Sequence, residues 1–223
     1  MEMHIRALYV HDEHSRLVSI NDWHGGVAPR FFLGRTNQGN LWRFRHDLPQ
    51  ALCDELQVLC EAEPFSTFER PRHEADYLRI LSAQTPVNKV WFGSAFWFAN
   101  PAPNAEEPIR INKQNAHLLE GGLQEWIPDL GYQQPVVALL VDGKAVAICA
   151  SVRITKDAHE AGVETVKAYR QKGYAVKVVA AWAREVNKLG ALPLYSLSNE
   201  NLASRNVANR LGLSQFGVDL HIT

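Results

Sequence analysis

Hydrophobic and polar positions alternate in some runs of this chain and recur at helical spacing in others, so the pattern predicts a mixture of strands and helices. Residues 5–20 predict two strands joined by a polar turn at 12–15. Two more strands are expected over 30–33 and 41–44, then helices over 48–61 and 73–82 with a loop over 64–71 between them. The first 85 residues therefore predict an antiparallel meander followed by two helices.

After Gln84-Thr-Pro the pattern changes, and we expect an amino-terminal α/β extension over 1–85 and a second domain over 86–223. The elements expected in the second domain are an aromatic-rich strand over 90–98, a loop over 100–107, a largely helical segment over 111–130 that Gly121-Gly122 interrupts, strands over 136–141 and 145–152 joined by Asp142-Gly143-Lys144, a strand over 160–166, a helix over 174–189, a strand over 192–197, a short helix from 201, and a last strand over 215–222.

The segment Arg170-Gln171-Lys172-Gly173-Tyr174-Ala175 lies where a strand should end and a helix should begin. A helix that opens on glycine presents several backbone N–H groups at the positive end of its dipole. Gly173 lets the backbone approach a ligand closely, and Ala175 is small. This arrangement suits the binding of a pyrophosphate, although R-x-x-G-x-A also occurs by chance.

A second pattern follows one strand and one helix later, and its positions hold Asn201, Ser204, Ala208, Gly212 and Leu213. Together the two patterns resemble the GNAT superfamily of acyl-CoA-dependent N-acetyltransferases. The resemblance covers about residues 88–221 and is strongest from 135 onward. It implies an α+β fold, with a mixed and mostly antiparallel central sheet flanked by helices. It also implies transfer of an acetyl group from acetyl-CoA to a primary amine of a small-molecule acceptor, within a ternary complex.

The resemblance also implies which residues hold the coenzyme. Backbone N–H groups of the loop would bind the pyrophosphate, and main-chain groups of Glu164, Thr165 and Val166 would pair with the pantetheine arm as an added strand. Asn201 and Ser204 would bond the arm from the next helix; alternatively, they are a helix cap and a packed small residue. The loop residues concerned are Arg170, Gln171, Lys172, Gly173, Tyr174 and Ala175.

The sequence leaves open which residues act as the general base and the general acid. The superfamily often uses a carboxylate on the strand before the loop, and this strand carries His159, Glu160 and Glu164. Counting back from the loop indicates His159, whereas a bulge in the strand would indicate Glu160, which we favour. Each of the three could instead be a solvent-facing edge residue. Many members of the superfamily place a tyrosine acid where this chain has Ala208, so Tyr195 and Ser196 are candidate replacements. Ala208 also leaves a non-catalytic acyl-CoA-binding module as the alternative function.

Composition limits the class of protein. The 223 residues carry a net charge of −1, so nothing indicates binding to nucleic acid or to an anionic membrane. The chain has no apolar run of membrane-spanning length and does not begin like a signal peptide, so we expect a cytoplasmic protein. We expect no metal, because His11 and His14 lack a third ligand, and ordinary buried thiols at Cys53, Cys60 and Cys149.

The resemblance leaves one strand of the superfamily unaccounted for, because the sequence ends after the strand over 215–222. This strand is either missing or supplied by another segment of the chain, and the amino-terminal meander is a candidate donor. The oligomeric state stays open, with a homodimer among the options.

Overall fold

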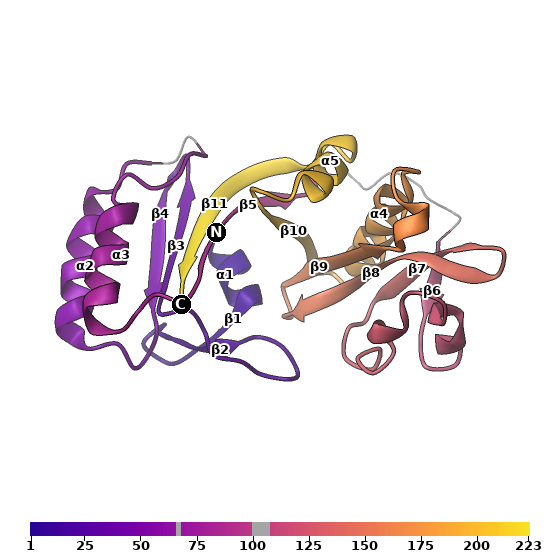
Figure 1. The fold of residues 1–223 in the computed structure, drawn as a ribbon, viewed down its shortest axis with the longest axis horizontal. Coiled ribbons are helices and arrows are strands. Elements are labelled where there is room, and N and C mark those ends of the chain that lie inside the picture. The colour runs from indigo at the N-terminus through magenta and orange to yellow at the C-terminus, as the bar shows by residue number, and fades with distance from the viewer. Residues whose placement is uncertain (66–67, 100–107) are drawn as a thin grey trace. The chain divides into compact units, whose positions relative to one another are not determined.

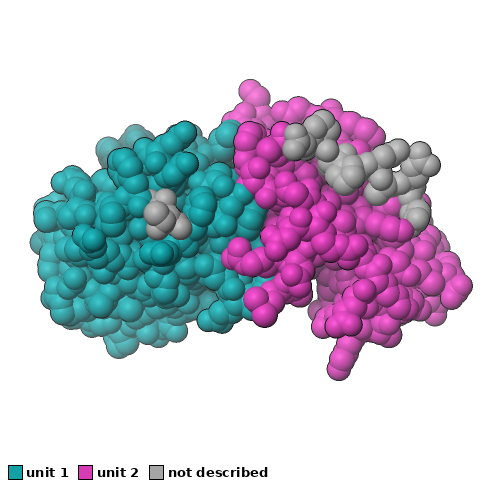
Figure 2. Space-filling model, turned by 90° about the horizontal axis from the view of Figure 1, so that it is seen from above, with its two compact units in different colours: residues 1–96, 196–201, 215–223 teal, residues 97–195, 202–214 magenta. Residues whose placement is uncertain are grey.

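The computed structural model describes residues 1–65, 68–99 and 108–223. It divides into two compact units: unit 1 comprises 1–96, 196–201 and 215–223, and unit 2 comprises 97–195 and 202–214 (Figure 2). The expected domain division after residue 85 stays a prediction, as does the loop over 100–107, which lies outside the described residues.

Unit 1 contains a mainly antiparallel sheet in the strand order β4-β3-β11-β5, together with a separate pair of strands, β1 and β2 (Figure 1). Strand β3 pairs antiparallel with β4 on one side and with β11 on the other. The amino-terminal meander therefore supplies a neighbour to the last strand of the chain, as expected. The elements of this unit are α1 (Glu2–Leu8), β1 (Tyr9–His11), β2 (Leu17–Ile20), β3 (Phe31–Thr36), β4 (Gly39–Phe44), α2 (Gln50–Ala62), α3 (Glu74–Gln84), β5 (Val90–Trp97) and β11 (Ser214–Ile222).

Side-chain alternation along β3 builds two cores in unit 1. Phe31 and Leu33 are fully buried in a cluster with residues of α2 and α3, whereas Phe32 is buried in a second cluster with Ile5 of α1 and Leu17 of β2. The helices α2 and α3 thus cover one face of the sheet, and the first 20 residues cover the other.

The prediction of a strand from residue 5 is wrong, because Glu2–Leu8 is the helix α1. His4, Ile5 and Ala7 are its buried residues, and Ile5 and Leu8 are spaced to lie on one helical face. Arg6 also donates to Glu2 one turn earlier, with 2.7 Å between Nε and Oε1. The helical period therefore prevails over alternation in this short apolar segment.

Unit 2 contains a sheet in the order β10-β9-β8-β7-β6, in which only the β9–β10 pair is parallel (Figure 1). The expected mixed, mostly antiparallel fold with flanking helices is therefore confirmed. The elements are β6 (Ile109–Ile111), η1 (Ala116–Leu119), η2 (Gln124–Trp126), β7 (Val136–Val141), β8 (Lys144–Ile154), β9 (Ala158–Thr165), η3 (Lys167–Tyr169), α4 (Tyr174–Lys188), the first part of β10 (Leu192–Ser198) and α5 (Leu202–Arg210).

The helix α4 packs on β7, β8 and β9 through a buried stripe that includes Val179, Trp182 and Val186. The turns of residues 116–130 bury Leu119, Leu123 and Leu130 in a cluster with Ile148 and other sheet residues. Ile148 and its neighbour Cys149 point to opposite faces of β8, so the sheet is enclosed on both sides.

The predicted helix over 111–130 is wrong. Ile109–Ile111 is the strand β6, which pairs with β7, and only two short 3-10 turns follow. Side chains compete for the backbone here, since Asn115 Oδ1 accepts from Asn112 N at 2.8 Å and Asn112 Oδ1 accepts from Gln114 N at 2.9 Å. Gly121 and Gly122 then have φ angles of 118° and 140°, which a helix cannot contain.

Candidate active site

The segment between β9 and α4 has the conformation of an anion-binding turn. Gln171 and Gly173 both have left-handed backbones, with φ angles of 64° and 81°, and α4 begins directly afterwards at Tyr174. No side chain caps this helix end, and its first turn contains no acidic residue. The positive end of the helix dipole is therefore not neutralised by an anionic side chain of its own first turn.

Gly173 lies directly against the guanidinium of Arg210 from α5. A Cβ atom built on Gly173 would lie 3.0 Å from Nη2 and 3.2 Å from Nη1 of Arg210. Among the described residues, we find no hydrogen bond or ion pair to the Arg210 side chain. This cation was not predicted from the sequence, because it lies 37 residues beyond Gly173 at a position that neither pattern specifies.

The loop itself is also positively charged. Residues 167–177 contain Lys167, Arg170, Lys172 and Lys177 and no acidic residue, a local signal that the near-neutral charge of the whole chain conceals. Arg170 is directed back toward the strand, since its Nε donates to the carbonyl oxygen of Thr165 at 3.1 Å. Lys172 places its Nζ 5.0 Å from the ring centroid of Tyr169. Arg210 is thus the cation placed against the glycine, while Arg170 is directed back to Thr165.

The edge of β9 that faces β10 is paired over only a short length. The register joins Ala158–Glu160 to Leu192–Leu194, and from Ala161 onward β9 is paired with β8 alone. Val166 is engaged within the protein, because its N–H donates to Val146 O at 2.9 Å and its carbonyl accepts from Tyr169 N at 2.8 Å. The strand edge suited to pairing with an extended ligand therefore runs from Ala161 to Thr165.

His159 is buried under α4. Its Nδ1 lies 2.9 Å from Oγ of Ser151, which also accepts from Nε1 of Trp182 at 3.0 Å. Burial lowers the pKa of His159, so the imidazole is neutral near pH 7. The histidine thus packs within the core of unit 2.

Glu160 and Glu164 point to the opposite face of β9 from His159. Glu160 is 2% exposed, so it is not a solvent-facing edge residue. Glu164 accepts from the indole Nε1 of Trp126 at 2.6 Å and so ties the turns of residues 116–130 to the sheet. The bulge expected in β9 is absent, because the irregular register lies in β8 between Ser151 and Arg153.

Tyr195 is 2% exposed near the end of β10. Its hydroxyl oxygen is buried without a hydrogen-bond partner among the described residues. Burial raises the pKa of this hydroxyl to about 12, while the nearby side chain of Ser204 on α5 acts in the opposite direction. Two candidate residues from different elements are therefore brought together. Asn201 immediately precedes α5 and is exposed, whereas Ala208 is fully buried on that helix.

The described part of the chain gives no support for metal or thiol chemistry at a clustered site. No group of three His, Cys, Asp or Glu side chains within it is placed to hold a metal ion. Cys53, Cys60 and Cys149 are unpaired and buried, as expected, and burial raises the pKa of Cys149. None of the described helices has the length and apolar character needed to cross a membrane.

Comparison with known proteins finds a family model that matches part of the chain. Residues 136–217 match the family model described as GNAT acetyltransferase, and no curated protein matches the sequence. A GNAT-family protein of Novosphingobium aromaticivorans is similar in structure, with a TM-score of 0.50 and 15% identity over 61% of this chain and 65% of that one, just under two thirds of its length. A GCN5-related N-acetyltransferase-like protein of Streptococcus suis has a TM-score of 0.50 and 16% identity over 88% of this chain and 85% of that one. At these identities the two structures show a shared fold.

Proposed function

We propose, from the match of residues 136–217 to the GNAT acetyltransferase family model, that the protein is an N-acetyltransferase. It moves an acetyl group from acetyl-CoA to a primary amine of a small-molecule acceptor, by direct attack in a ternary complex.

The observation that carries the proposal is the conformation of the Gly173 turn. A left-handed glycine, an uncapped helix end and an adjacent guanidinium form a cradle with the chemistry that a diphosphate requires. In this proposal the backbone N–H groups of the loop and α4 bind the pyrophosphate, and Arg210 adds a charge-assisted contact.

The neighbouring strand edge would hold the pantetheine arm. Main-chain groups of Ala161–Thr165 on the side away from β8 have the extended geometry for pairing with an amide-containing chain. Asn201 and Ser204 would bond the same arm from the start of α5. This pairing fixes the thioester relative to the amine, which reduces the entropic cost of their encounter.

Two side chains are proposed for proton transfer. Glu160 would accept a proton from the attacking amine, directly or through water, because it is the buried carboxylate on the face opposite His159. Tyr195 would donate its phenolic proton to the departing thiolate, and its raised pKa keeps that proton in place at neutral pH. His159 is proposed as structural, since Ser151 and α4 enclose it.

Binding of the coenzyme is tested with a matched pair of glycine variants. Gly173 and Gly190 stand at the two ends of α4 with φ angles of 81° and 80°, but a Cβ atom would meet Arg210 only at Gly173. We expect Gly173→Ala to raise the dissociation constant for CoA at least tenfold and Gly190→Ala to leave it unchanged, measured by calorimetry. No binding of CoA to the wild type, or equal effects in both variants, would refute the proposal.

Turnover is tested by following the release of CoA thiol from acetyl-CoA with a panel of primary amines. Glu160→Gln is expected to lower kcat at least 100-fold while CoA affinity is retained. The second candidate function, a non-catalytic acyl-CoA-binding module, is favoured by the buried Ala208 at the usual position of the tyrosine acid. Tight CoA binding without turnover on any amine would establish that alternative.

A further inference from the structure

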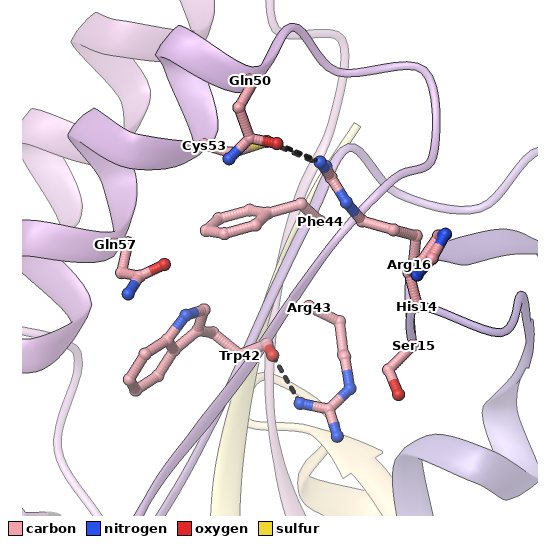
Figure 3. Close-up of a pocket in the computed structure, with 9 residues that line it drawn as sticks. All are labelled: His14, Ser15, Arg16, Trp42, Arg43, Phe44, Gln50, Cys53 and Gln57. Carbon is pink, nitrogen blue, oxygen red and sulfur yellow. Dashed lines mark hydrogen bonds between the residues drawn. The ribbon is translucent and has the colours of Figure 1, made fainter.

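Unit 1 contains a cavity of its own, between the start of β2, the strand β4 and the helix α2 (Figure 3). Its volume is about 270 Å³, close to the lower end of the range for small-molecule sites. The lining residues are His14, Ser15, Arg16, Trp42, Arg43, Phe44, Gln50, Cys53 and Gln57. None of them is acidic, and two are arginines.

Arg16 is the residue that gives this cavity its chemistry. Its Nη2 donates to Gln50 Oε1 and its Nη1 contacts Cys53 Sγ, both at 2.9 Å. Every hydrogen-bond partner of the guanidinium among the described residues is uncharged, so no carboxylate bonds it directly. The carboxylate of Asp12 lies near enough for the two charges to interact. A partly buried cation that no carboxylate bonds directly attracts an anion more strongly than a cation at the open surface does.

The turn that carries Arg16 is fixed in place. Asp12 Oδ1 accepts from the backbone N–H of His14 at 2.9 Å and of Arg16 at 2.8 Å. Gln50 then holds the guanidinium from the first turn of α2. An anchored guanidinium loses little side-chain entropy when a ligand binds, which favours recognition of a planar oxyanion.

The remaining groups define the rest of the ligand. Trp42 and Phe44 offer aromatic surface from β4. Gln57 of α2 lies on the side of the cavity away from Arg16 (Figure 3). Carboxylates bond three of the lining residues: Glu2 pairs with Arg43, Asp54 with Gln50 and Glu61 with Gln57, each at 2.7 to 2.8 Å. Arg16 is the lining arginine that no carboxylate bonds directly. The wall is therefore cationic on one side and aromatic on the other.

We propose that this cavity binds a small aromatic oxyanion, whose carboxylate or phosphate contacts Arg16 and whose ring lies against Trp42. All of the cavity's lining residues lie in unit 1, and none of them belongs to the proposed coenzyme site. The relative affinities of benzoate and phenyl phosphate distinguish the two oxyanion chemistries.

The test uses benzoate, phenyl phosphate and the neutral isostere benzamide with the full-length protein. Binding is followed by the NMR resonance of the Trp42 indole N–H, identified by its loss in Trp42→Phe. We expect saturable shifts with dissociation constants on the order of 1 mM for an anion and none for benzamide. The tighter of the two anions identifies the oxyanion that the site prefers.

Variants locate the site. Arg16→Gln removes the charge but keeps amide donors and should weaken anion binding about tenfold, while Arg79→Gln on the exposed surface of α3 should have no effect. Gln57→Glu adds a negative charge to the wall formed by α2 and should also weaken anion binding. Gln57 is exposed, and its substitution leaves Arg16 intact. Equal binding of benzamide, or unchanged anion binding in both Arg16→Gln and Gln57→Glu, would overturn the proposal. CoA affinity should be unchanged in every case, which separates this outcome from the acetyltransferase proposal.

Discussion

The imidazole Nε2 of His221 lies 2.7 Å from Oδ2 of Asp219, a carboxylate with no exposed surface. His4 of α1 places its own Nε2 3.1 Å from the same oxygen, and Tyr9 places its hydroxyl 2.7 Å from His221 Nδ1. Burial alone would raise the pKa of Asp219, but the two histidines outweigh it and lower the pKa to about 2. A single carboxylate of β11 thus anchors the first residues of the chain.

Asp219→Asn should destabilise unit 1 markedly. The variant removes the charge that His4 and His221 share, and the amide oxygen that replaces the carboxylate is a weaker acceptor for the two imidazoles. We expect a loss of about 3 kcal/mol in the free energy of unfolding, measured by urea denaturation at pH 7. Asp76→Asn on α3 is the control, since Asp76 is half-exposed and should contribute less than about 0.5 kcal/mol. An equal loss in both variants would show that the buried cluster contributes no more to the free energy of unfolding than a surface carboxylate does.

The same carboxylate predicts a pH dependence of stability. Its folded-state pKa of about 2 lies below the ordinary value of 3.8, so its contribution is complete above about pH 4 and is lost as the pH falls through 2. The difference in unfolding free energy between wild type and Asp219→Asn should therefore shrink by about 2 kcal/mol between pH 5 and pH 2. A difference that stays constant across this range would contradict the assignment.

Ser151→Ala should destabilise unit 2. The hydroxyl of Ser151 is the shared partner of His159 Nδ1 and Trp182 Nε1, both within the core under α4. Its removal leaves two buried nitrogen atoms without that partner, which should cost about 1 to 3 kcal/mol in thermal or urea unfolding. Ser82→Ala at an exposed position of α3 is the matched control and should be neutral or slightly stabilising. A silent Ser151→Ala would show that water or rearrangement replaces the bond.

The elements predicted best from the sequence are those whose signals are local. The hairpin at Asp142-Gly143, the helix from Tyr174 and the strands on either side of it have their turns, caps and periodicity within a few residues. The segment over 111–130 was predicted wrongly because side-chain bonds of Asn112 and Asn115, and pairing of Ile109–Ile111 with β7, override its apolar spacing. The helix at Glu2–Leu8 was missed because its apolar positions fit two periods equally well.

In the candidate site, too, the features with local signals were predictable from the sequence and the contacts between distant segments were not. The glycine turn is contiguous in sequence, so its conformation could be predicted from Gly173 and the helix that follows. The contact of Arg210 with that turn, the bond of Trp126 to Glu164, and the enclosure of His159 by Ser151 depend on how α5, η2 and α4 pack. Packing between distant segments leaves no signature in spacing, so those roles became visible only in the structure.

Arg210→Ala should weaken the binding of CoA because the guanidinium lies against the glycine that would approach the diphosphate. A charge-assisted bond to phosphate is worth about 1.5 to 3 kcal/mol, so the dissociation constant should rise about tenfold or more. Pantetheine, which lacks the phosphates, should bind both proteins equally, and the loss should be smaller at high salt because the missing interaction is electrostatic. Lys188→Ala, at the exposed far end of α4, is the control for a change in net charge alone. If Lys188→Ala weakens CoA as much as Arg210→Ala, the effect is a property of overall charge, and Arg210 has no specific place in the phosphate site.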